Sequence, residues 1–135
     1  MSSFAVVNPA TGELLEEFPE IGAAELDAAL AAADGAHRTW SRSTTAAQRA
    51  ELVRRVGELH SERREELADI IVTEMGKPRD QALGEIDFCA DIYSYYADNG
   101  PSLLADEAIE LSGGSGSALV RYQSLGVILG IMPWN

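Results

Sequence analysis

The sequence is poor in positive charge and in cysteine. Its 135 residues include 10 lysines and arginines against 22 aspartates and glutamates, which gives a net charge of −12. A chain this acidic repels nucleic-acid backbones and anionic lipid, so we expect neither kind of partner. The single cysteine, Cys89, cannot form an internal disulfide, which fits a reducing compartment.

Targeting signals, membrane spans and metal-ligand clusters are also missing. The first nine residues carry no basic region and no long apolar run, unlike a signal or transit peptide. No later stretch is long and apolar enough to span a bilayer, so we expect a cytoplasmic protein. His37 and His60 have no partners at a useful ligand spacing, so we expect no metal site.

The sequence begins with a strand-turn-strand pattern. Residues 8–13 are dense in turn formers and separate two short apolar segments, 4–7 and 14–18, which predicts a β-hairpin. From residue 23 the apolar residues recur at steps of three and four, which predicts a helix to about Trp40 with fraying near Gly35.

Further helices follow. Thr45 and Gln48 have the spacing of a capping box that opens a helix. Ser61 either caps a further turn or continues the same helix, and the apolar stripe runs on to a stop at Gly76. Another helix is predicted from about Pro78 to Asn99, ended by Gly100 and Pro101. Its expected buried face consists of Leu83, Ile86, Cys89, Ala90, Tyr93, Tyr96 and Ala97. On that face we expect Cys89 to be an inert small hydrophobe rather than a nucleophile.

The helical period disappears beyond residue 106. Segments 107–111 and 118–123 have strand patterns, and the Gly/Ser-rich tip 112–117 joins them into a predicted hairpin that could pair with something outside this chain. Residues 126–132 form a nearly continuous apolar run, the pattern of a strand covered on both faces in a parallel sheet. Such a strand needs neighbours to satisfy its backbone groups, and none follows, so we expect a truncated chain.

The chemistry-bearing residues come directly after that run. Ligands of open parallel sheets bind beyond the C-terminal ends of the strands, where Pro133, Trp134 and Asn135 lie. The Asn135 amide can donate to a developing oxyanion, and Trp134 offers a flat apolar wall. By spacing alone, an asparagine after a strand is more often a turn former, so both interpretations stay open.

Four segments in register resemble the aldehyde dehydrogenase superfamily: residues 8–13, 74–78, 95–107 and 126–135. The third of these resembles the succinate-semialdehyde branch of that superfamily. The resemblance covers essentially the whole chain. One departure is Ser124, which stands where the family usually has proline.

The resemblance implies an α/β fold in three parts. Residues 1–106 would form the N-terminal hairpin and helices of a Rossmann-like cofactor domain, and residues 107–124 a β-hairpin oligomerisation arm. Residues 125–135 would form the first parallel strand and the oxyanion turn, where the chain is truncated. A homodimer or homotetramer assembled through the arm is implied as well.

The resemblance also implies a reaction. The family oxidises an aldehyde, here succinate semialdehyde, to the carboxylate through a cysteine thioester, with NAD or NADP as cofactor. Asn135 would donate its amide to the oxygen of the hemithioacetal and, with Ile131, Met132, Pro133 and Trp134, would line the cofactor site. The nucleophilic cysteine and the general-base glutamate match positions after residue 135, so this chain alone should be inactive. The alternative is a non-catalytic helical binding or structural module.

Overall fold

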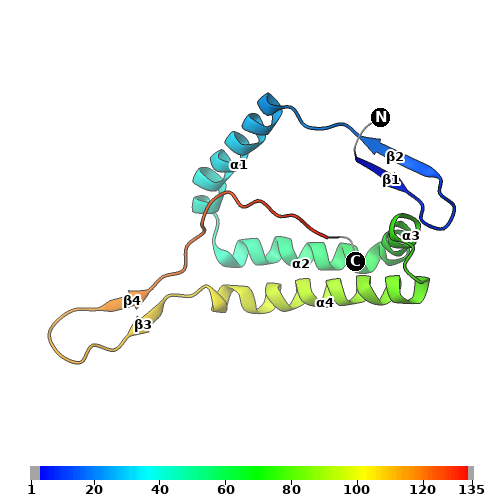
Figure 1. The fold of residues 1–135 in the computed structure, drawn as a ribbon. Helices are drawn as coiled ribbons and strands as arrows, with labels where there is room; N and C mark the ends of the chain where they lie inside the picture. The colour runs from blue at the N-terminus through cyan, green and yellow to red at the C-terminus, as the bar shows by residue number, and fades with distance from the viewer. Residues whose placement is uncertain (1–3, 134–135) are drawn as a thin grey trace.

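The computed structural model describes residues 4–133, which form four helices and two small antiparallel hairpins (Figure 1). The strands are β1 (Phe4–Val7), β2 (Leu14–Phe18), β3 (Glu107–Ile109) and β4 (Ala118–Val120), and the helices are α1 (Ala23–Ser43), α2 (Ala46–Glu62), α3 (Arg64–Met75) and α4 (Arg79–Leu103). Helices α2 and α4 lie side by side, α3 packs at one end of α4, and α1 rises from the other end of the pair. None of the helices in residues 4–133 could cross a membrane.

The first hairpin is confirmed with the predicted bounds. Phe4 pairs with Phe18, and the turn is closed by a hydrogen bond of 2.8 Å from the Gly12 N–H to the Asn8 carbonyl. The turn lies against the end of α3, because a Cβ at Gly76 would come within 2.8 Å of Pro9 Cγ. Gly76 also has a φ of 78°, which favours glycine, so this residue ends α3 and leaves room for the hairpin.

The predicted helical stretch from Thr45 to Gly76 is two helices, with the break at Arg63. The capping box at its start is confirmed: the Gln48 N–H donates to Thr45 Oγ1 at 3.1 Å, and the Thr45 N–H donates to Gln48 Oε1 at 2.8 Å. The expected fraying of the preceding helix is wrong, because α1 continues without a break through Gly35.

Helix α4 is longer than predicted, because Gly100 and Pro101 do not end it. Pro101 lies in the last turn, where its missing N–H removes a single bond near the end of the helix. The N–H of Leu104 still donates to the Gly100 carbonyl at 3.1 Å.

The core lies between α3 and α4. Its buried residues are Ala68, Ile71, Ala82 and Ile86, and the two alanines are fully covered, which lets the helices approach closely. Helices α2 and α4 are also close, since a Cβ at Gly57 would lie 3.1 Å from Tyr93 Cβ. The predicted buried face of α4 is right at Ile86 and Ala97 but wrong at Tyr96, which is 55% exposed because the neighbouring helices cover only a narrow stripe.

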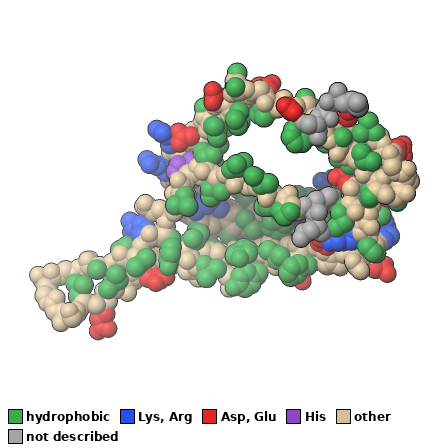
Figure 2. Space-filling model, in the orientation of Figure 1, with side chains coloured by type: hydrophobic (Ala, Val, Ile, Leu, Met, Phe, Trp, Pro, Cys, Tyr) green, Lys and Arg blue, Asp and Glu red, His purple; other side chains and the backbone are tan. Residues whose placement is uncertain are grey.

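The second hairpin is an arm that projects away from the helices (Figures 1 and 2). Strands β3 and β4 are shorter than predicted and pair with Glu107 opposite Val120. At the base of the arm, Arg121 Nε donates to Asp106 Oδ1 at 2.9 Å. The large apolar side chains of the arm are exposed, including those of Ile109, Leu111 and Leu119.

The parallel strand predicted for residues 126–132 is absent. Residues 127–133 belong to no helix or strand, and Leu125, Leu129 and Met132 are 91%, 85% and 89% exposed. A strand exists through ladder hydrogen bonds to a neighbour, and no segment within residues 4–133 pairs with this one. The apolar pattern is typical of a buried segment, but no part of residues 4–133 buries these side chains.

Candidate functional site

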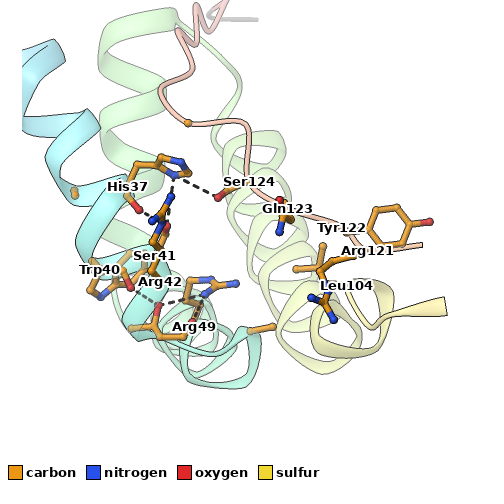
Figure 3. Close-up of a pocket in the computed structure, with 14 residues that line it drawn as sticks. His37, Trp40, Ser41, Arg42, Arg49, Leu104, Arg121, Tyr122, Gln123 and Ser124 are labelled. Carbon is orange, nitrogen blue, oxygen red and sulfur yellow. Dashed lines mark hydrogen bonds between the residues drawn. The ribbon is translucent and has the colours of Figure 1, made fainter. Parts of the chain in front are cut away.

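A hollow lies between the end of α1, the start of α2 and the segment that leaves the arm (Figure 3). Its volume is about 960 Å³. Polar residues from all three elements line it: His37 and Ser41 from α1, Arg49 from α2, and Arg121, Gln123 and Ser124 from the segment. Sequence analysis missed this hollow, because its residues are spread over some 90 positions and form no local motif.

Two of the arginines that line the hollow, Arg49 and Arg121, are hydrogen-bonded to other parts of the chain. Arg49 Nη1 donates to the Thr44 carbonyl at 2.7 Å and to Thr44 Oγ1 at 3.2 Å, which ties α2 to the connection from α1. Arg121 holds Asp106, and its guanidinium lowers the pKa of that carboxyl. A hydrogen bond of 2.9 Å to Glu107 raises the pKa of the Tyr122 hydroxyl. These groups close the base of the arm.

His37 links α1 to the returning segment. Its Nδ1 lies 3.3 Å from Ser124 Oγ and 3.4 Å from Ser41 Oγ (Figure 3). The Ser41 hydroxyl also donates to the His37 backbone carbonyl one turn earlier in the same helix. Ser124 is therefore the contact through which His37 reaches another part of the chain.

Of the residues predicted to bind the cofactor, Ile131, Met132 and Pro133 lie further along the same segment and do not line the hollow. Ile131 and Met132 are 82% and 89% exposed, and Pro133 is exposed too. Trp134 and Asn135 lie outside the described residues. In Figure 1 the segment leaves β4, passes the end of α1 and runs on above α2 in that view.

Cys89 behaves as an inert thiol. It is half-buried on α4, and burial, with a smaller contribution from Glu85, raises the pKa of its thiol. A raised pKa keeps the sulfur protonated at neutral pH, which is the opposite of an activated nucleophile. Within residues 4–133, no group of three histidine, cysteine or carboxylate side chains could hold a metal ion.

The sequence profile described as "Aldehyde dehydrogenase family" matches residues 1–135, and the chain belongs to this family. Among curated relatives, it is 44% identical over 132 residues to the succinate-semialdehyde dehydrogenase [NADP(+)] of Deinococcus radiodurans, covering 98% of this chain and 27% of that protein. It is 41% identical over 129 residues to the succinate semialdehyde dehydrogenase [NAD(P)+] of Escherichia coli, covering 96% of this chain and 27% of that one.

Solved structures show the same fold. The succinic semialdehyde dehydrogenase of Streptococcus pyogenes, solved in complex with NADP+, superposes with a TM-score of 0.83 at 30% identity. The match covers 90% of this chain and 26% of that one. The chain thus spans about a quarter of the length of the proteins it resembles, 27% of the Deinococcus radiodurans protein and 26% of the Streptococcus pyogenes one.

Proposed function

We propose that the full-length protein containing this chain oxidises succinate semialdehyde to succinate, with NADP+ or NAD+ as the electron acceptor. The observation that carries the proposal is the identity of 44% and 41% to two succinate-semialdehyde dehydrogenases along nearly the whole chain. Both relatives are named for these cofactors.

The chain contributes the first part of a cofactor domain and one pass of an assembly arm. In this proposal residues 1–106 belong to a Rossmann-like domain, and residues 107–124 pair with a neighbouring subunit. The exposed apolar residues of the arm, such as Ile109 and Leu119, support the second assignment, because a two-stranded hairpin has too little core to be stable alone.

Residues 125–135 supply the catalytic contribution of this chain. Ile131 and Met132 present exposed apolar side chains, which suit the flat ring of a nicotinamide, and we assign them to the cofactor site with Pro133, Trp134 and Asn135. The bound cofactor supplies a hydride acceptor. The Asn135 amide donates to the oxygen that becomes negatively charged when a cysteine thiolate from a later part of the protein attacks the aldehyde.

The test is a steady-state assay of the full-length protein with NADP+ and with NAD+. Succinate semialdehyde is compared with butanal, which has the same carbon number and lacks the carboxylate. We expect kcat/KM for the semialdehyde to be higher by a factor of about 100 or more, because a site that pairs with a carboxylate discriminates strongly against its absence. Equal values would assign the protein to another branch of the family, and no cofactor reduction with any aldehyde would refute the proposal.

A further inference from the structure

We infer that two polar pairs at the base of the arm set its strand register and so prepare it for pairing with a second copy of the protein. These arm-base contacts are Asp106 with Arg121 and Glu107 with Tyr122. The inference rests on the proposed function, in which residues 107–124 contact a neighbouring subunit, and deepens it. It assigns control of assembly to polar residues at the base of the arm.

The first observation is that both pairs join the two strands of the arm at its base. Arg121 Nε donates to Asp106 Oδ1 at 2.9 Å and to Asp106 Oδ2 at 3.2 Å. The Tyr122 hydroxyl donates to Glu107 Oε1 at 2.9 Å. Both partners of each pair lie within residues 106–122, so the contacts are local to the hairpin.

The second observation is that the two pairs lie on opposite faces of the hairpin. Opposed residues of an antiparallel pair share a face, and successive residues of a strand alternate between faces. Glu107 is opposite Val120, so it shares a face with Val120 and, two positions further, with Tyr122. Asp106 and Arg121 follow in the same register and lie on the other face. A pair on each face restrains the hairpin against bending in either direction.

The third observation is that the tip of the arm does not fix the register. A two-residue turn would do so through its own geometry. Here β3 ends at Ile109 and β4 begins at Ala118, and the Gly/Ser-rich stretch 112–117 lies between them. Such a connection is flexible, and three opposed pairs hold the strands together. The register is therefore determined at the base of the arm.

The register decides which side chains the arm presents on each face. In the observed register Leu119 lies on one face, and Ile109 and Val120 lie on the other. A slip of one residue moves the side chains of a strand to the opposite face. Since a neighbouring copy contacts one particular set of side chains, a slipped arm presents the wrong set.

The experiment measures subunit association of the full-length protein by mass photometry over a dilution series, at a urea concentration that half-dissociates the wild type. Asp106→Ala and Arg121→Ala should each weaken association about 4- to 25-fold. An exposed ion pair changes an equilibrium by a factor of about two to five, and a symmetric interface contains the change twice. The double variant should lose no more than either single one, because both remove the same pair.

Three further variants separate the pair from other roles of its residues. The charge exchange Asp106→Arg with Arg121→Asp re-forms the pair and should restore most of the association, whereas residues that contacted the neighbouring subunit directly would gain nothing from it. Tyr122→Phe removes the second contact and should weaken association about twofold. Asp34→Ala is the matched control: it removes an exposed ion pair of 2.8 Å to Arg38 within α1 and should leave association unchanged.

The outcomes distinguish the two proposals. A wild-type protein that is monomeric at micromolar concentration without urea refutes the assembly role of the arm in the proposed function. An assembled wild type with unchanged association in the two alanine variants refutes the role of the arm-base contacts alone, as does a loss that the charge exchange does not restore. Should the alanine variants fail to fold, Tyr122→Phe still decides, because it removes a single oxygen atom.

Discussion

The core between α3 and α4 and the segment that returns from the arm differ in how far their apolar side chains are covered. In α3 and α4, Ile71 and Ile86 are 5% and 6% exposed, covered by neighbours from within the chain. In the segment, Ile128 and Ile131 are 74% and 82% exposed. Isoleucine side chains are therefore buried by neighbouring helices in the core and exposed in the segment.

The difference shows which structure is encoded locally and which depends on partners. Helices satisfy their own backbone hydrogen bonds, so a pair of adjacent helices can form from nearby sequence alone. A central parallel strand needs a hydrogen-bonded neighbour on each side. Its apolar sequence pattern predicts burial but does not identify the neighbouring strands. We propose that later parts of the full-length protein provide that burial.

The largest expected effect comes from truncating isoleucine in the helical layer. Ile86→Ala removes a buried side chain from the core between α3 and α4 and should destabilise the full-length protein by about 2–5 kcal/mol. Denaturant unfolding of the purified protein measures this free energy.

Ile128→Ala is the matched change in the segment. If later parts of the full-length protein cover the segment, its cost should be of similar size, about 2–5 kcal/mol. If the segment stays as exposed as it is here, the cost should be within about 0.5 kcal/mol of zero, and the proposed burial would be wrong.

Sequence patterns predicted the fold well where structure is local. The bounds of the first hairpin followed from residues 8–13, and the start of α2 followed from Thr45 and Gln48. Ala82 was missed, because an alanine gives a weak periodic signal although its small size is what allows the helices to meet. The strand at 126–132 was wrong because an apolar pattern cannot supply a pairing partner.

The site was harder to predict than the fold. Pro133, Trp134 and Asn135 stood out by their position after a predicted strand, Ile131 and Met132 by resemblance to a family, and the roles of all five remain proposals. The contact between His37 and Ser124 had no sequence signal, because 87 positions separate two common residue types. Such a contact exists only once the arm has turned the chain back toward α1 (Figure 1).

Gly76→Ala should have the next largest effect. The new methyl group would meet Pro9 at a residue with φ of 78°, so we expect a loss of about 1–3 kcal/mol and a loosened first hairpin. Thermal unfolding, with hydrogen exchange at the amides of β1 and β2, measures both. Gly35→Ala is the control of opposite sign: it lies inside α1 with open space around it and should stabilise the protein by about 0.5–1 kcal/mol.

The capping box of α2 should show a smaller effect. Thr45→Ala removes the acceptor for the Gln48 N–H and should cost about 1 kcal/mol. Thr39→Ala is the comparison, because the Thr39 hydroxyl bonds a carbonyl within α1 that already has a helical partner. Urea unfolding of both variants should show a loss for Thr45→Ala and a change near zero for Thr39→Ala.

The smallest expected effect is a pH dependence at the base of the arm. Arg121 lowers the pKa of Asp106 in the folded state, so the pair stabilises the arm above the ordinary aspartate range. This contribution is lost as the pH falls through the lowered pKa. The protection of the β3 and β4 amides against hydrogen exchange, measured relative to the intrinsic exchange rate at each pH, should therefore fall at acidic pH. Asp106→Asn should remove this pH dependence. If the variant keeps the same pH dependence, the titrating group is not Asp106.

Replacement of Asn135 tests the central claim most directly, namely that this chain carries the oxyanion donor of an aldehyde-oxidising enzyme. In the full-length protein, Asn135→Ala should lower kcat by a factor of about 100–1,000 without preventing NADP+ binding, while Asn99→Ala, a control on α4, should leave kcat unchanged. A kcat within twofold of the wild-type value in Asn135→Ala would contradict the account.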